Sequence, residues 1–97
     1  MTDTLEIRRK KLRIRAWRRG FKEADLILGR FADDNLDGMD EAAVLAFEHL
    51  LDQQDQDIYA WVIGREPVPA QFDGPLMKAL QEFRVDKDAA FGDGPRA

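Results

Sequence analysis

Apolar residues recur at three- and four-residue spacing through most of this 97-residue chain, which is the period of one face of an α-helix. The segment 21–35 shows the pattern well, with Phe21, Ala24, Leu28 and Phe31 on one face. We find no convincing β-strand pattern of alternating apolar and polar residues. The sequence therefore predicts an all-α fold, a small five-helix bundle with short loops.

Capping residues and helix breakers set the expected boundaries. Thr4 or Asp3 can cap the first helix and Asp40 the third, because short polar side chains accept hydrogen bonds from the free amides of a first turn. Gly64 is a natural helix stop. The expected helices run from the first cap to about residue 17, over 21–35, from 40 to about 51, over 57–63, and from about 75 onward.

The composition limits the chemistry that the chain can carry. It contains no cysteine, which excludes disulfides, thiol catalysis and thiolate metal sites. Its apolar runs are far shorter than the roughly 20 residues that span a bilayer, and the basic N-terminal segment is not followed by the apolar region of a signal peptide. We expect one domain with one small core.

The charge is unevenly distributed along the chain. Residues 1–22 hold nine Lys and Arg against two carboxylates, a net +7, whereas residues 23–97 hold six against seventeen, a net −11. A basic head on an acidic body favours either orientation toward an acidic partner or attraction between the two regions within one fold. The head also supports an alternative function, a basic-headed helical regulatory or nucleic-acid-associated module. The pI near 4.9 and the absence of a recognition motif disfavour it.

The acidic turn after the second expected helix copies the start of a calcium-binding loop. Asp33, Asn35 and Asp37 stand at the first, third and fifth positions, and Gly38 stands at the sixth. The twelfth position, which requires a bidentate glutamate, is Val44. We therefore expect an acidic interhelical turn and no calcium.

No set of residues favours an enzyme. His49 is the single histidine; it has no serine or cysteine nucleophile beside it, and one histidine cannot form a usual zinc site. No glycine-rich loop for phosphate is present. We expect neither a metal nor a cofactor bound by the chain itself.

The junction of the first two expected helices is the best candidate for contact with a partner. Arg18 and Arg19 precede Gly20, and Glu23 follows. Glycine lets another backbone or a ligand approach closely, and arginine offers a rigid fork of donors to carboxylates and phosphates. From spacing alone, a simpler interpretation is favoured, in which Arg19 and Glu23 form an i,i+4 ion pair that stabilises by about 0.3–0.5 kcal/mol.

The segment 18–28 resembles the RGxxE region of the SdhE family, the succinate dehydrogenase flavinylation assembly factors. The second half agrees through Phe47, Leu50 and Leu51, the block Asp55-x-Asp57-Ile58-Tyr59-Ala60-Trp61-Val62, and Gly64 and Pro67. Ala24 departs from the pattern, because many members carry a larger apolar residue there. The resemblance covers roughly residues 7–84. It divides the chain into an N-terminal extension (1–6), an SdhE-like five-helix domain (7–85) and a flexible tail (86–97) that is polar and contains Gly and Pro.

The resemblance implies a function. Members bind the flavoprotein subunit of succinate dehydrogenase, and in some bacteria that of fumarate reductase, and promote covalent attachment of FAD to a histidine of that subunit. They are assembly factors and not enzymes, and the FAD belongs to the partner. The chain is accordingly expected to be a monomer when free, in the bacterial cytoplasm, without nucleic acid and without insertion into a membrane.

The family motif maps onto Arg19, Gly20 and Glu23, with Asp25 as a weaker member and Arg18 beside them. Gly20 would permit close docking, Arg19 would pair with a partner carboxylate or dipole, and Glu23 would orient Arg19 or a partner base. Docking would hold the flavoprotein in a conformation that aligns its histidine with the flavin, which is a shift of population. We expect Gly20→Arg to block docking and to leave the helices folded.

Overall fold

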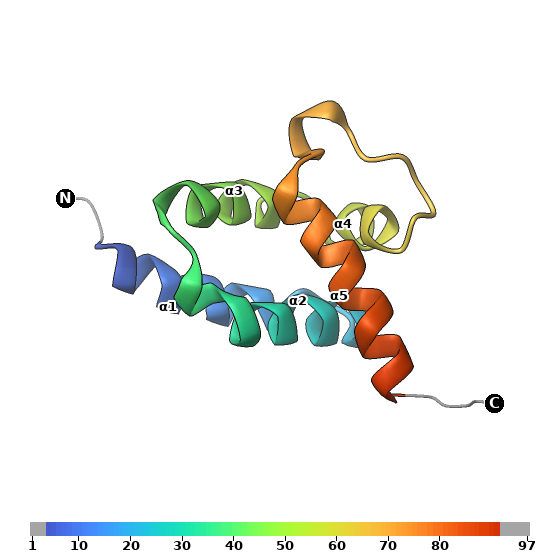
Figure 1. The fold of residues 1–97 in the computed structure, drawn as a ribbon, viewed down its shortest axis with the longest axis horizontal. Helices are drawn as coiled ribbons and strands as arrows, with labels where there is room; N and C mark the ends of the chain where they lie inside the picture. The colour runs from blue at the N-terminus through green and yellow to red at the C-terminus, as the bar shows by residue number, and fades with distance from the viewer. Residues whose placement is uncertain (1–3, 92–97) are drawn as a thin grey trace.

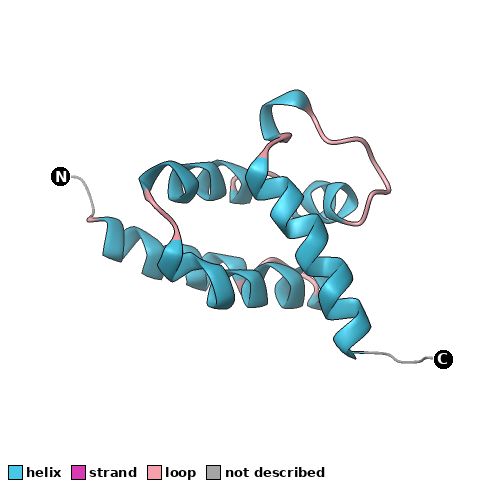
Figure 2. Ribbon diagram, viewed as in Figure 1, coloured by secondary structure: helices cyan, strands magenta, loops and turns pink. Residues whose placement is uncertain are grey.

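A computed structural model describes residues 4–91, with side chains to Phe83, and shows only helices and loops in that range (Figure 1, Figure 2). The α-helices are α1 (Leu5–Ala16), α2 (Lys22–Asn35), α3 (Glu41–Leu51), α4 (Asp55–Val62) and α5 (Pro75–Phe91), and the short 3-10 helices are η1 (Leu36–Gly38) and η2 (Ala70–Phe72). The prediction of an all-α five-helix fold is confirmed. None of the helices in residues 4–91 combines the length and the hydrophobicity needed to cross a bilayer.

Side-chain caps begin α1 and α3 where the sequence predicts them. The hydroxyl of Thr4 accepts a hydrogen bond from the amide of Ile7 at 3.2 Å. The carboxylate of Asp40 accepts one from the amide of Ala43 at 2.9 Å. Each cap satisfies one of the amides that a first helical turn leaves without a partner.

Helix α4 begins two residues before its expected start at Asp57. Asp55 and Asp57 both lie in its first turn, where the partial positive charge of a helix N-terminus favours carboxylates. Gly64 follows its end with φ +81°, and the amide of Arg65 donates to the carbonyl of Ala60 at 2.8 Å, which is the expected glycine stop.

The two ends of the chain differ in part from the expected layout. Helix α1 starts at Leu5, directly after the expected cap at Thr4, so the segment 1–6 that precedes the SdhE-like domain contains the start of this helix. Helix α5 runs to Phe91, six residues into the segment 86–97 expected to be a flexible tail. The remainder of the expected tail, 92–97, lies outside the described residues.

The helices pack around one core. Helix α1 contacts both α2 and α3, and α5 crosses α2 and α4 (Figure 1). Phe31 lies at the centre, with its ring edge-on to those of Phe47 (5.9 Å between centroids) and Phe83 (5.4 Å). The buried cluster around it is formed by Leu12, Ala16, Leu28, Phe31, Ala32, Leu36, Met39, Val44, Phe47, Leu50, Leu51, Ile58, Val62, Met77 and Leu80.

Trp17 fixes how α1 leads into α2. A Cβ built on Gly29 would lie 2.2 Å from the indole ring of Trp17, so only glycine leaves room for this contact. The indole nitrogen donates to the carboxylate of Asp33 at 3.3 Å. The tryptophan therefore lies flat against α2 and places the loop that follows it.

The basic face of α1 is bound by the acidic body of the same chain. Arg8 contacts Glu48 at 2.7 Å and Arg15 contacts Asp52 at 2.8 Å. Arg13 contacts Asp33 at 3.3 Å, and it also contacts Asp37 in the acidic turn. The attraction between the basic residues 1–22 and the acidic residues 23–97, one of the two interpretations of the charge pattern, is therefore present within the fold.

Candidate functional site

The loop between α1 and α2 forms a sharp corner, which we call the Gly20 corner (residues 18–25). Helix α1 ends before Trp17 and α2 begins at Lys22, with Phe21 at its N-cap. Gly20 has φ +122°, a region that residues with a side chain rarely adopt. The direction change between the two helices therefore depends on this glycine.

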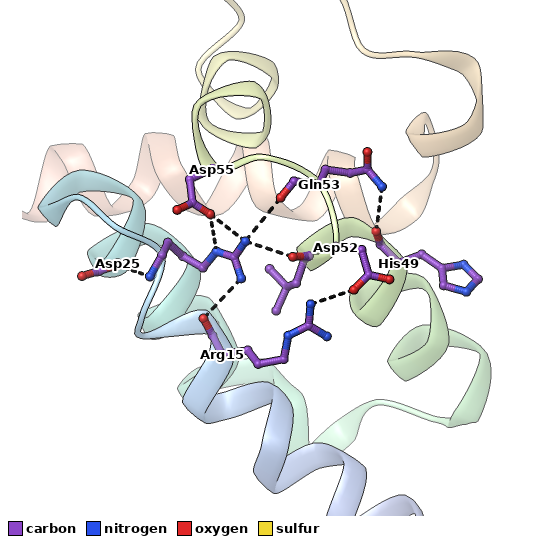
Figure 3. A network of polar contacts seen from close by, with 8 residues as sticks. Arg15, Asp25, His49, Asp52, Gln53 and Asp55 are labelled. Carbon is purple, nitrogen blue, oxygen red and sulfur yellow. Dashed lines mark hydrogen bonds and ion pairs between the residues drawn. The ribbon is translucent and has the colours of Figure 1, made fainter.

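Arg19 points from the corner into the molecule, and its side chain is only 10% exposed. Its Nε lies 2.8 Å from Oδ1 of Asp55, and its Nη2 lies 2.6 Å from the same oxygen. Figure 3 shows Asp55 and Gln53 beside this guanidinium, and Asp25 at the backbone nitrogen of the same residue. The ion pair joins the end of α1 to the start of α4.

Arg19 also closes the C-terminal end of α3. Its Nη2 donates to the carbonyl of Leu51 at 2.9 Å and to that of Gln53 at 3.4 Å, and its Nη1 donates to the carbonyl of Arg15 at 3.5 Å. The last carbonyls of a helix have no partners within the helix and carry partial negative charge. One guanidinium therefore holds the ends of α1 and α3 and the start of α4 together.

Asp25 braces the corner from the other side. Its Oδ1 accepts a hydrogen bond from the backbone amide of Arg19 at 2.6 Å. This contact spans the turn from the first helical turn of α2 back to the residue before Gly20. Asp25 thus has a partner within the chain, and its contribution to an outer surface stays a prediction.

Gly20 lies directly against Asp55. A Cβ built on Gly20 would be 2.7 Å from Oδ2 of Asp55, closer than real Cβ contacts. The other face of Gly20 is exposed to solvent. On the inner side, the absence of a Cβ at Gly20 leaves room for the Asp55 carboxylate that pairs with Arg19. On the outer side, no side chain covers the backbone of Gly20.

The outer side of the corner carries charged groups without internal partners. Arg18 and Glu23 are exposed, and neither side chain forms a hydrogen bond or an ion pair with the described residues. Beside them, the ring of Phe21 lies edge-on to that of Tyr59 at 5.2 Å, and the guanidinium of Arg65 lies 6.0 Å from the Tyr59 ring centre. The outer side thus offers a cation, a carboxylate, free backbone and an aromatic edge.

The structure corrects the expected Arg19–Glu23 pair. Residues 18–21 are not helical, so the i,i+4 rule, which needs a continuous helix, does not apply between these two positions. Asp55, which is 36 residues away in the sequence, takes the place of Glu23. The idea that Glu23 orients Arg19 is therefore wrong, and Arg19 has its guanidinium nitrogens occupied by its own chain.

The structure also bears on Gly20→Arg, the variant expected to block docking and to leave the helices folded. Any side chain at Gly20 combines an unfavourable φ with a collision against the Asp55 carboxylate. Such a variant would disturb the Arg19–Asp55 pair that ties three helices together. It cannot separate a defect in docking from a defect in folding.

Sequence reasoning missed Asp55 as a member of the site. It appeared only as one residue of the acidic block that carries the family resemblance, with no signal pairing it to Arg19. No group of three or more His, Cys, Asp or Glu side chains in the described part of the chain could hold a metal ion. The site therefore consists of a structural interior, made by Arg19, Asp25 and Asp55, and an open outer surface.

Comparison with known proteins decides what kind of protein carries this corner. The model of the Sdh5 family, described as the flavinator of succinate dehydrogenase, matches residues 10–84. The chain belongs to the Sdh5 family. This confirms the family resemblance drawn from the sequence, and the matched region contains the whole corner and helix α4.

Individual relatives agree with the Sdh5 assignment. A mitochondrial succinate dehydrogenase assembly factor 2 of Scheffersomyces stipitis is 38% identical over 90 residues, 89% of this chain and 60% of that protein. The FAD assembly factor SdhE of Acetobacter pasteurianus is 32% identical over 80 residues, 82% of this chain and 73% of that protein. A mitochondrial assembly factor 2 of Danio rerio is 32% identical over 88 residues, and the chain spans 56% of its length.

Proposed function

We propose that this chain binds the flavoprotein subunit of succinate dehydrogenase and promotes covalent attachment of FAD to a histidine of that subunit. The family description and the names of the relatives support the activity. The chain acts as an assembly factor, and both the FAD and the acceptor histidine belong to the partner. Fumarate reductase flavoprotein is a second substrate of the same class.

The outer side of the Gly20 corner is the docking surface in this proposal. The observation that carries it is that Gly20 is exposed between Arg18 and Glu23, whose side chains have no partner among the described residues. Charged groups that are already desolvated and paired gain little from a new partner, whereas these two are free to pair across an interface. Bare backbone between them lets a partner approach closely.

Arg19 acts from beneath this surface. It holds Gly20 against α4 through Asp55, so the exposed backbone keeps one shape before the partner arrives. A surface that is ordered in advance loses less conformational entropy on binding. The bound flavoprotein is then held in the conformation in which its histidine faces the flavin, and the chain contributes no reacting group.

The nucleic-acid alternative loses its main support in the structure. It depended on a free row of arginines in α1, but Arg8, Arg13 and Arg15 pair with carboxylates of α3 and of the segments that flank it. Phosphate contacts by these side chains would require the pairs to break first. The observations favour a protein partner.

Covalent flavin fluoresces in denaturing gels, which gives the test. The flavoprotein subunit from cells that lack this chain is expected to lose most of its in-gel fluorescence at unchanged subunit level, and wild-type chain is expected to restore it. Purified chain should also form a complex with the apo-flavoprotein subunit. Full fluorescence in cells without the chain, or no complex under any condition, would contradict the proposal.

A further inference from the structure

Two adjoining hollows lie where α5 begins and crosses α3, and one of their lining residues, Gln53, also accepts a hydrogen bond from Arg19. One hollow, of about 620 Å³, lies between the C-terminal half of α3 and the start of α5. The other, of about 810 Å³, lies between the N-terminal half of α3, the end of α2 and α5. Both are lined by Ala42, Ala46, Pro75 and Leu76, so they form one continuous groove, which we call the α3–α5 groove.

The floor of the α3–α5 groove is apolar and partly exposed to solvent. Ala42 and Ala46 are exposed, and Leu45 beside them is 45% exposed, one of three large hydrophobic residues exposed in the described part of the chain. Small side chains on one face of a helix let a second helix approach closely. Helix α3 advances by about 10 Å from Ala42 to His49, which is the length of roughly two turns of a docked helix.

The rim of the α3–α5 groove is acidic. Asp34, Asp40, Asp52 and Asp73 are among the lining residues, and none of the described residues that line the groove is a lysine or an arginine. Asp52 remains 62% exposed although it contacts Arg15. An apolar floor between carboxylates selects a segment that presents apolar anchors flanked by cations.

We propose that the α3–α5 groove binds an amphipathic helix of a partner protein, with apolar anchors on one face and Lys or Arg beside them. A helix fits because two of its turns match the length of α3 that lines the groove. Its apolar anchors, spaced at i, i+3 or i+4 and i+7, would enter the two hollows in succession. This surface is distinct from the Gly20 corner, and the inference does not rest on the proposed function.

A second copy of the chain is a poorer occupant. Its basic residues are concentrated in its N-terminal part, and Arg8, Arg13 and Arg15 are held by the carboxylates of their own chain. The remainder of the chain, residues 23–97, carries a net −11, so like charges would meet at the groove. The charge of the rim therefore favours a basic segment of another protein.

The test uses the purified full chain and a stapled helical peptide of about 14 residues built from leucine and lysine, because unstapled helices of this length are marginal in water. A leucine–glutamate peptide of the same pattern is the charge-reversed probe. Binding is measured by fluorescence anisotropy, and the contact site is mapped by amide chemical shifts. The expected result is binding of the lysine peptide, weakened by salt, with shifts at Ala42, Leu45, Ala46 and Leu76.

Matched variants separate groove binding from general attraction to an acidic protein. Ala46→Glu fills the floor while making the chain more acidic, and we expect it to weaken binding about tenfold or more. Ala70→Glu makes the same exchange at an exposed position that lines neither hollow, and is expected to change binding less than about twofold. Asp73→Asn on the rim should weaken binding more than Asp57→Asn, which is exposed in α4 outside the groove.

Several results would overturn the inference. Equal binding by Ala46→Glu and Ala70→Glu, equal binding of the two peptides, or shifts that lie outside the groove would each show nonspecific attraction. A wild-type dimer in sedimentation that Ala46→Glu dissociates would show a second copy as the occupant. No binding of the lysine peptide at low salt would show that the groove does not receive a basic helix.

Discussion

Nε and Nη2 of Arg19 contact one carboxylate oxygen of Asp55 at 2.8 and 2.6 Å, across 36 residues of sequence. Through this contact the Gly20 corner joins α1 to α4 on its inner side, while its outer side is an exposed surface. The arginine works on the inner side with Asp25, while Gly20 and Glu23 face outward. Substitutions in this short segment should therefore separate into those that change folding and those that change docking.

Arg19→Ala is expected to lower the free energy of unfolding by about 2–4 kcal/mol, because Asp55 and the end carbonyls of α3 lose a largely buried partner. Arg19→Lys keeps a charge but not the planar fork, so a smaller loss is expected. Urea unfolding followed by circular dichroism measures both. Arg18→Ala, at the exposed neighbouring position, should stay within about 0.5 kcal/mol of wild type. Equal losses at the two positions would show that the inner contacts do not stabilise the fold.

Gly20→Ala is expected to lower the free energy of unfolding by about 1–3 kcal/mol, because alanine disfavours the φ of this position and its Cβ would collide with Asp55. Part of this cost should disappear when the colliding carboxylate is removed, so Gly20→Ala should cost less in an Asp55→Ala background than in wild type. A double-mutant cycle of unfolding free energies measures the difference. If the cost were the same in both backgrounds, the close contact between Gly20 and Asp55 would be refuted.

Gly29→Ala places a methyl group where the Trp17 ring lies, and should destabilise by about 1–3 kcal/mol with a change in tryptophan fluorescence. Gly38→Ala is the matched control, since nothing lies within 4 Å of a Cβ at that position. It should leave both stability and fluorescence near wild type. A Gly29→Ala protein as stable as Gly38→Ala would mean that Trp17 does not pack on α2.

The hydrogen bond from Arg8 lowers the pKa of Glu48 below its ordinary value. The charged form of Glu48 thus favours the fold above the ordinary glutamate pKa of about 4.3, and this stabilisation is lost as pH falls through the lower folded-state pKa. Glu48→Gln should therefore lower the melting temperature by a few degrees near neutral pH, and the difference from wild type should vanish in acid. Thermal unfolding across this pH range checks the trend. Glu82→Gln makes the same exchange at an exposed position of α5, and an equal loss of melting temperature in both variants near neutral pH would contradict a specific role for the Arg8–Glu48 pair.

Helical periodicity and capping chemistry were sufficient to predict most of the fold. The caps at Thr4 and Asp40 and the stop at Gly64 are local features, so the sequence displays them directly. The partner of Arg19 could not be predicted in this way, because spacing offered Glu23 whereas packing brings Asp55 to it. Contacts between distant segments depend on how helices pack, and the sequence alone gave no distance between α1 and α4.

The central claim is that the outer side of the Gly20 corner, and not its inner tie, meets the flavoprotein. Glu23→Gln removes an exposed carboxylate with no partner among the described residues, and Glu41→Gln makes the same exchange in the first turn of α3, where only a 3.5 Å contact with Arg8 is lost. Both variants should remain folded, with losses of at most about 1 kcal/mol.

The decisive measurement is in-gel flavin fluorescence of the succinate dehydrogenase flavoprotein subunit in cells that carry each variant at equal level as the sole copy. We expect Glu23→Gln to reduce the fluorescence at least about fivefold, the effect of losing roughly 1 kcal/mol of binding where the complex limits the yield, and Glu41→Gln to match wild type. Wild-type fluorescence with a folded Glu23→Gln protein, or equal reductions with both variants, would contradict the account.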